Sequence, residues 1–303
     1  MGDKIDVSII IVNYHTSSLL VECLKSINEN TTALDYEVII VDNGSEPDLK
    51  EILESTIKEI NKKNYRLILL NDNKGFGSAN NEGLKIARGR NILFLNPDIL
   101  LLNNGIKTLS DFLDNNPKVG ACGGNLHNAN MQPVYSFKRI SPGILWETDE
   151  LLNNWIQKLL YGKNKNYNHK EKPDKVKNLS GANLMVKKKC LNTTGNFSDK
   201  YFMYFEDTDL CRRIRKAGWS TYNIPQAKFI HFGSKASKNL PSEVKLGWLE
   251  ESRRMYYQQH LSPFEAKISD FIYYIFLLSR ILLIKDFKKR EIYKKRMKYF
   301  KNG

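Results

Sequence analysis

The sequence predicts an α/β fold with a doubly wound, mostly parallel sheet and a C-terminal helical extension. Four short, continuously apolar runs rich in β-branched residues lie in the first hundred positions, and amphipathic helical patterns separate them. This alternation is typical of parallel strands that are covered on both faces. Each run ends in polar residues. Because ligands of such sheets bind beyond the carboxyl ends of the strands, we expect a nucleotide pocket there.

The elements can be placed in order along the chain. Strands are expected at Val7–Val12, Glu37–Val41, Arg66–Leu70 and Asn91–Leu95, and helices at Ser17–Asn28, Asp48–Asn61, Ala79–Ala87 and Ile106–Asn115. Gly120–Tyr135 is typical of strands and turns, and the Lys/Asn-rich Lys163–Lys177 of a mobile loop. Ordered structure should resume at Leu179, with helices at Asp207–Ala217, Val244–His260 and Ile268–Ile284.

The positive charge is concentrated in two places. The 303 residues include 47 Lys and Arg against 33 Asp and Glu, a formal net charge of +14. Lys158–Lys189 has ten basic and two acidic residues, Lys285–Gly303 has nine and two, and Met1–Gln157 has 15 and 20. A hydrophobic content of 41% excludes a disordered chain. Local patches favour a phosphate-rich or membrane-like partner, and no nucleic acid is expected.

The cysteines indicate a reducing compartment. Cys23, Cys122, Cys190 and Cys211 are far apart and form no CxxC pair, so they are interpreted as reduced core thiols. The first six residues lead directly into an apolar strand, without the apolar region of a secretion signal. We therefore expect a cytoplasmic protein.

Two groups of carboxylates can carry chemistry. Asn96–Pro97–Asp98 follows the fourth strand directly, where Asp98 could hold a divalent metal that binds a diphosphate; the same residues also suit a plain turn. The second group, Glu206, Asp207 and Asp209, lies among aromatic residues at a helix start. Capping and first-turn acids explain one of these residues well but three poorly, and an aromatic setting can turn a carboxylate into a general base.

Two further motifs leave alternatives open. His231 in FIHFGS could contact a phosphate or its metal, although a lone histidine is more often structural. Gly75–Asn80 (GFGSAN) follows the third strand and is similar to a dinucleotide fingerprint, but Asn80 replaces the third glycine. A nicotinamide-dependent oxidoreductase therefore stays an alternative function, as does a non-enzymatic basic protein that binds membrane or nucleic acid.

These motifs in this order resemble the family 2 glycosyltransferases of the GT-A fold, in particular their rhamnosyltransferase-like branch. The resemblance extends from Val7 to about His231 and rests on the segments VSIIIVNY, VIIVDNGS, NKGFGSANNEG, FLNPD and FMYFEDTDLCRRIRKAGW. It implies an inverting transfer of a sugar from a nucleoside diphosphate donor. It also implies a catalytic region at 1–240, with a nucleotide-sugar half (1–118) and an acceptor half (119–240), before a helical, basic extension at 241–303.

The resemblance also implies a role for each candidate residue. Donor contacts are assigned to Asn13, Tyr14, Asp42, Asn43, Asn73, Gly75, Asn80 and Asn96. Asp98 corresponds to the metal acid of a D-x-D motif whose first acid is here Asn96, and His231 would be a further ligand of Mg²⁺ or Mn²⁺. Asp207 corresponds to the catalytic base, and Glu206 to a neighbour that orients the acceptor or sugar. Ser180, Gly181 and Ala182 would lie at the acceptor mouth, unless they are an ordinary turn.

The expected partners follow from the same comparison and from the C-terminus. A UDP- or dTDP-linked donor, with rhamnose as the first guess for the sugar, would serve a glycan or lipid-linked glycan acceptor in cell-surface polysaccharide synthesis. Ile268–Ile284 is shorter than the roughly 20 residues of a spanning helix, and a basic tail follows it. It is typical either of an interfacial helix on an anionic membrane surface, which would make the protein peripheral on the inner face of the plasma membrane, or of a helix packed on the core.

Overall fold

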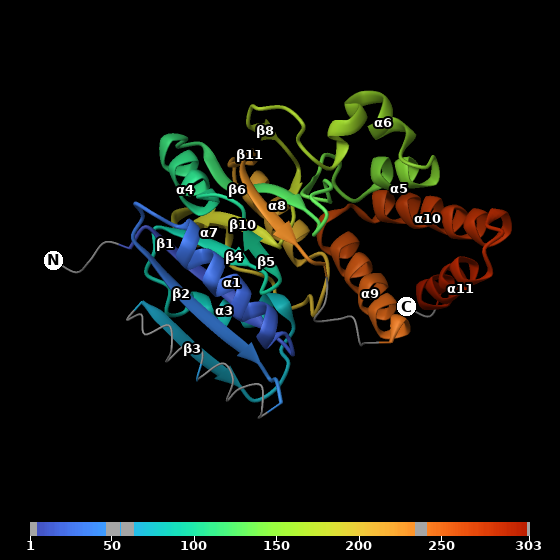
Figure 1. Ribbon diagram of the computed structural model, residues 1–303. Coiled ribbons are helices and arrows are strands. Elements are labelled where there is room, and N and C mark those ends of the chain that lie inside the picture. The colour runs from blue at the N-terminus through green and yellow to red at the C-terminus, as the bar shows by residue number, and fades with distance from the viewer. Residues whose placement is uncertain (1–4, 47–54, 56–63, 234–240, 302–303) are drawn as a thin grey trace.

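A mixed sheet with helices on both faces forms the centre of the molecule (Figure 1). The structure, a computed structural model, describes residues 5–46, 55, 64–233 and 241–301. The first four strands are parallel, as predicted, and they lie in the order β3-β2-β1-β4. They comprise β1 (Val7–Asn13), β2 (Tyr36–Asn43), β3 (Tyr65–Leu70) and β4 (Asn91–Leu95). The helix expected at Asp48–Asn61 lies outside the described residues apart from Ser55.

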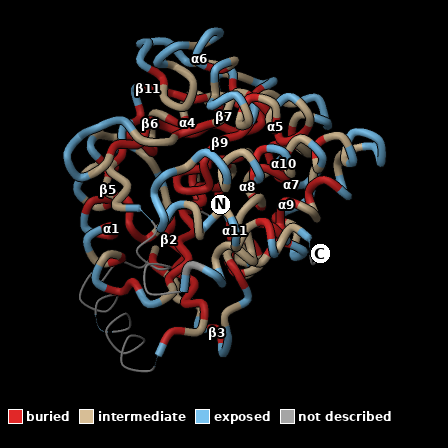
Figure 2. Tube along the Cα trace, turned by 90° about the vertical axis from the view of Figure 1, so that its right-hand side faces the viewer, coloured by how far each residue is buried: buried red, intermediate tan, exposed pale blue. Residues whose placement is uncertain are grey.

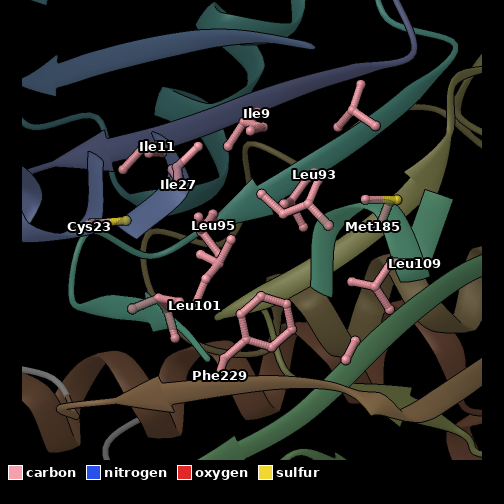
Figure 3. Close-up of a cluster of buried hydrophobic side chains, with 14 of the residues drawn as sticks. Ile9, Ile11, Cys23, Ile27, Leu93, Leu95, Leu101, Leu109, Met185 and Phe229 are labelled. Atoms are coloured by element: carbon pink, nitrogen blue, oxygen red, sulfur yellow. The ribbon is translucent and has the colours of Figure 1, made fainter. Parts of the chain in front are cut away.

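The described helices of this half of the chain match the predicted ones within a few residues. They are α1 (Ser17–Asn30), α3 (Phe76–Leu84) and α4 (Gly105–Asn115). Alternate residues of β1 face two different apolar clusters. Ile9 and Ile11 pack with α1 and α4, and Ile10 packs with α3 on the other side. Figure 3 shows the first cluster, where Ile27 of α1 lies beside Ile11. Burial on both faces is the reason that the strand is continuously apolar.

The second half of the sheet is mixed, which the sequence did not predict. Strand β10 (Asn183–Lys187) lies antiparallel between β4 and β6 (Val119–His127). Next comes β11 (Ser220–His231), parallel to β6 and antiparallel to the short β5 (Ile99–Leu101). In this register His231 lies opposite Ile99. The end of β11 therefore returns to the turn that follows β4.

The segment expected to be a mobile loop is instead attached to the sheet. It contains a 3₁₀ helix, η1 (Gly162–Lys165), and strand β8 (Asp174–Lys175), which pairs with β11. Asn168 is buried, and its carbonyl accepts a hydrogen bond from the Asn125 side chain at 2.8 Å. Most lysines of the Lys163–Lys177 segment are exposed, whereas Asn168 is buried. The polar composition of the segment therefore did not indicate its contacts with the sheet.

Short elements connect the sheet to the C-terminal helices. Strands β7 (Phe137–Lys138) and β9 (Asn178–Leu179) form a second small sheet, and helices α5 (Ile144–Leu151), α6 (Trp155–Tyr161), α7 (Lys188–Thr194) and α8 (Glu206–Lys216) surround it or cover the large sheet. In Figure 2 the strands are mostly buried, whereas the region around α6 is largely exposed.

Three helices form the C-terminal extension: α9 (Ser242–His260), α10 (Pro263–Leu283) and α11 (Phe287–Lys301). They lie beside α8 and α5, as Figure 1 shows. Helix α10 begins five residues earlier than predicted because Ser262 and Glu265 form a reciprocal capping box, with Pro263 in the first turn. Among the described helices, none combines the length and the apolar character needed to cross a membrane.

Candidate active site

The turn after β4 and the end of β11 bring three predicted residues together. His231 Nε2 lies 3.3 Å from Asp98 Oδ1 and 3.4 Å from the Asn96 side-chain nitrogen. The backbone N–H of Phe232 donates to the Asp98 carbonyl, which ties the two segments to each other. Asp98 is 5% exposed. Asn96 and His231, which are 135 positions apart, thus belong to one polar site. The sequence predicted that Asp98 and His231 would lie together in such a site.

This site suits a divalent cation. The second carboxylate oxygen of Asp98 is buried and has no hydrogen-bond partner, which is costly for an anionic group without a ligand. Two ligand atoms on one ion with bonds of about 2.1 Å are separated by about 3 Å, close to the observed Nε2–Oδ1 distance. The described residues contain no group of three or more His, Cys, Asp or Glu that could hold a metal. An ion here would therefore need further ligands besides Asp98 and His231, such as water or substrate oxygens.

The predicted nucleotide residues meet at the ends of β1 and β2. Asn13 and Asp42 are fully buried, and the Asn13 amide donates to Asp42 Oδ1 at 2.8 Å. The backbone N–H of Ser45 donates to the other Asp42 oxygen. These contacts hold the Asp42 carboxylate in one orientation at the edge of the sheet. Tyr14 follows Asn13 and is half-buried, with its ring against that of His15.

A second polar network shapes the start of α3. Asn43 donates to Asn73 Oδ1 at 2.8 Å, and the Gly75 N–H donates to the same oxygen at 2.9 Å. The buried Asn80 side chain donates to the carbonyl of Phe76 within the helix. Asn43, Asn73 and Gly75 are thus joined by hydrogen bonds between the end of β2 and the start of α3, and Asn80 lies one turn into that helix. Which of them touch the donor stays a prediction.

The glycine segment serves packing within the chain. Gly75 has a φ of +83°, and a Cβ there would lie 2.4 Å from the Phe202 carbonyl. The first N–H of α3, that of Phe76, donates to this carbonyl at 3.0 Å. A dinucleotide fingerprint needs such a helix start for a pyrophosphate. Here the loop before α8 occupies it, which argues against the oxidoreductase alternative.

Glu206 and Asp207 begin helix α8, after two aromatic residues with unusual backbone angles. Tyr204 and Phe205 have φ values of +70° and +65°, a conformation that costs such residues about 1–3 kcal/mol each. The Asp207 carboxylate accepts from the Gly181 N–H at 2.9 Å and from the Thr208 N–H at 2.6 Å. Glu206 is buried, and its Oε2 has no partner. The strained loop thus presents two adjacent carboxyl groups with different surroundings.

The two carboxyl groups also differ in their pKa values. Burial, together with the neighbouring Asp207, raises the pKa of Glu206 to about 8. Burial also raises the pKa of Asp207, but the N–H groups of Gly181 and Thr208 and the Lys138 ammonium oppose that rise. Burial disfavours the charged form of both groups, but Asp207 also has the N–H groups of Gly181 and Thr208 and the Lys138 ammonium, which favour its anion. Two adjacent carboxyl groups with such different surroundings suit a proton acceptor and a hydrogen-bond donor.

The Ser180–Gly181–Ala182 turn connects the two sites. The Asn96 N–H donates to the Ala182 carbonyl at 3.0 Å. The N–H of the preceding residue, Gly181, donates to the Asp207 carboxylate. The turn therefore touches the Asn96–Asp98 segment on one side and the Glu206–Asp207 pair on the other. The sequence assigned this turn to the acceptor mouth. That assignment stays a prediction, whereas the bridging role of the backbone was not anticipated.

Sequence reasoning missed the side chains that surround Asp207. Lys138 of β7 lies 3.7 Å from the centre of the Trp146 ring, and burial lowers its pKa. Charge interactions couple Asp207 to both Lys138 and Tyr135. Both residues belong to YSFKRI, which has no periodic pattern. The one available signal was that two aromatic residues stand beside two basic residues in this segment.

The third acid of the group has a structural role. Asp209 is fully buried and pairs with Arg213 at 2.7 Å and with His260 of α9 at 2.6 Å. These partners lower its pKa although burial acts in the opposite direction. Asp209 thus joins α8 to the C-terminal helices.

Comparison with known proteins agrees with this arrangement. The profile of "Glycosyl transferase family 2" matches residues 8–195. N-acetylglucosaminyl-diphospho-decaprenol L-rhamnosyltransferase of Mycobacterium tuberculosis is 26% identical over 74% of this chain and 75% of its own length. Rhamnosyltransferase WbbL of Escherichia coli is 26% identical over 73% of this chain and 83% of its own length.

Two solved structures share the fold. The Pyrobaculum calidifontis mannosyltransferase PcManGT, in complex with GDP-Man and Mn²⁺, has a TM-score of 0.60 and 14% identity, covering 99% of this chain and 86% of its own. GalNAc-T7 with UDP, GalNAc and Mn²⁺ has a TM-score of 0.65 and 15% identity, covering 100% of this chain and 57% of its own. The fold is therefore of the GT-A type, and the chain belongs to glycosyl transferase family 2 and is a glycosyltransferase.

Proposed function

We propose that this glycosyltransferase moves a deoxyhexose such as rhamnose from a dTDP- or UDP-linked donor to a hydroxyl of a lipid-linked glycan. Two relatives with rhamnosyl transfer in their names, each aligned over more than 70% of the chain, support the sugar. The name of the mycobacterial relative also supports a lipid-diphosphate acceptor. We assign the reaction to the cytoplasm, where nucleotide sugars are used in the synthesis of surface polysaccharides.

The observation that carries the proposal is the backbone link between the two carboxylate sites. Ala182 binds the Asn96–Asp98 turn, and Gly181 binds Asp207. Adjacent residues thus make the contacts to the two sites, so a donor diphosphate beside Asp98 and an acceptor hydroxyl beside Asp207 would meet across this turn. Inversion requires that the base and the leaving group lie on opposite sides of the reacting carbon.

Each side chain then has a task. Asp207 accepts the proton of the acceptor hydroxyl as the glycosidic bond forms, and the Gly181 and Thr208 N–H groups keep its carboxylate oriented. Glu206, protonated below a pH of about 8, donates a hydrogen bond to the acceptor or the sugar. Asp42, held by Asn13, can accept the imide N–H of uracil or thymine.

A divalent cation completes the donor site in this proposal. Asp98 and His231 would hold Mg²⁺ or Mn²⁺, for which the unpartnered Asp98 Oδ2 is the best support. When bound, the ion would offset the negative charge of the leaving diphosphate. Asn96 supplies a neutral amide at the position of a second acid. The protein would therefore offer the ion one carboxylate here, and the substrate phosphates would supply further negative charge.

Nucleotide binding measured by thermal stabilisation tests the proposal. UDP, dTDP and their sugar conjugates are added with and without Mn²⁺, and at least one should raise the melting temperature more with the metal. Asp98→Asn should remove the metal-dependent part, whereas the exposed Asp72→Asn, at the same sheet edge, should leave it intact. If no nucleotide stabilises the wild-type protein, the donor assignment is wrong.

A further inference from the structure

Helix α10 is apolar on two opposite faces. One face carries Tyr273, Phe276 and Leu277, which are buried in a cluster with residues of α5 and α11. The other face is exposed along the helix. It carries Phe264 (72% exposed), Phe271 (64%), Ile275 (37%), Leu278 (38%) and Leu282 (70%). At 3.6 residues per turn these five side chains fall within a sector of about 60° and extend over about 27 Å.

A second exposed apolar group lies at the end of this helix. In α6, Trp155, Leu159 and Leu160 are 59–68% exposed. The Arg280 guanidinium in the last turn of α10 donates to Asn153 Oδ1 at 2.7 Å and to the Glu150 carbonyl at 3.0 Å. The start of α6 is therefore fixed against the end of α10. Leu283 and Phe287, 74% and 69% exposed, follow directly after this contact.

Both basic stretches of the sequence place lysines next to these exposed apolar residues along the chain. Lys158 and Lys163 are exposed in and after α6, and Lys285, Lys288 and Lys289 are exposed around the start of α11. Within the described part of the chain, none of these five lysines makes an ion pair, whereas the later Lys294, Lys295 and Arg296 do. Two exposed acids also lie here: Glu265 forms the capping box with Ser262, and the Asp286 carboxylate accepts from the Lys289 N–H. The charge that borders the exposed apolar residues is thus mostly positive.

From this arrangement we infer that α6, the outer face of α10 and the start of α11 form one surface that docks on an anionic lipid bilayer. We call it the apolar–basic surface. An amphipathic helix with lysines beside its apolar side chains lies in the membrane interface, where Trp is also favoured. Unpaired lysines are attracted to anionic headgroups. A second copy of the chain fits less well, because a symmetric contact would bring equal lysine clusters together.

The inference rests on the proposed function in one respect: a lipid-linked acceptor would lie at the same bilayer. The full chain is tested by flotation with vesicles of phosphatidylcholine alone and of phosphatidylcholine mixed with phosphatidylglycerol. Wild type should bind the anionic vesicles selectively. The double variant Leu282→Ser/Leu283→Ser should bind them at least about tenfold less. The triple variant Lys285→Ser/Lys288→Ser/Lys289→Ser should lose the preference for phosphatidylglycerol.

Controls separate this surface from general effects. Leu69→Ser/Met131→Ser removes two exposed apolar side chains elsewhere (42% and 50%, against 70% and 74% for Leu282 and Leu283) and should bind as wild type does. Nucleotide release from the donor, measured without vesicles, should be equal in all variants. If wild type turns over the donor but does not float with vesicles, the docking inference is wrong and the proposed function stands. If wild type floats but does not turn over the donor, the docking inference stands and the proposed function is wrong. A dimer in sedimentation that the leucine variant abolishes, without vesicle binding, would replace the bilayer with a second copy.

Discussion

Two carboxylates on one helix have opposite surroundings. Asp207 lies at the start of α8, faces the Ser180–Ala182 turn, and binds N–H groups without a direct cationic partner among the described ion pairs; its pKa is raised. Asp209, two positions later, is enclosed by Arg213 and His260, and its pKa is lowered. Both residues are aspartates of the same helix, so the surroundings of each side chain, and not the residue type, distinguish the candidate base from the structural carboxylate.

The difference follows from helix geometry. Residues two apart on a helix point about 200° away from each other. Asp207 therefore faces the Ser180–Ala182 turn, and Asp209 faces α9. Burial disfavours the charged form of Asp207, so this carboxylate gains from accepting a proton. The Asp209 carboxylate is already stabilised by Arg213 and His260. Chemistry is expected at the first position and stability at the second.

Asp207→Asn should have the largest effect on activity. The amide keeps the size of the side chain but cannot accept a proton, so sugar transfer should fall by about a hundredfold to ten-thousandfold. Nucleotide binding should remain at the wild-type value. The melting temperature should fall slightly, because the Asn oxygen replaces only one of the two carboxylate oxygens that accept from the Gly181 and Thr208 N–H groups. Transfer is measured with a radiolabelled donor, and binding by calorimetry. Full activity in this variant would mean that another group is the base.

Asp209→Asn is the matched opposite. It leaves the Arg213 and His260 side chains without their shared anion in a buried site, which should lower the free energy of unfolding by about 3–5 kcal/mol. Urea denaturation measures this loss. The protein that remains folded should transfer sugar at a rate within a few fold of wild type. A large loss of turnover without a loss of stability would erase the contrast between the two aspartates.

The sequence predicted the group of acids but not this division of roles. His260 lies 51 positions after Asp209, and no local pattern indicates that they meet. The strands of the nucleotide half were predictable because burial on both faces leaves continuous apolar runs. The antiparallel direction of β10 was not, because NLMVK is equally apolar in either direction and the path of the preceding loop decides it. Lys138 escaped notice because β7 is two residues long.

Glu206→Gln should alter the pH dependence of stability. Glu206 has a folded pKa of about 8, raised from 4.5, so the folded state keeps this proton while the unfolded chain releases it. Wild type therefore loses stability through this group as pH rises from about 4.5 to about 8, on the order of a few kcal/mol. The variant has no such loss, so its advantage in melting temperature should grow across this range and then level off. If the difference in melting temperature between Glu206→Gln and wild type were the same at pH 4.5 and at pH 8, the raised pKa of Glu206 would be refuted.

The smallest effect is expected from Lys138→Met, which tests how the surroundings adjust the base. The Lys138 ammonium favours the ionised form of Asp207. Without it the Asp207 pKa should rise, and the acid limb of the rate profile should move to higher pH by about one unit or less. Lys187→Met is a close control, because Lys187 also lies over a tryptophan ring and has a pKa lowered by burial, but its charge partners are Asp114 and two cysteines. An equal shift in both variants would mean that the limb reports something other than Asp207, whereas a shift confined to Lys138→Met identifies this aspartate as the titrating base.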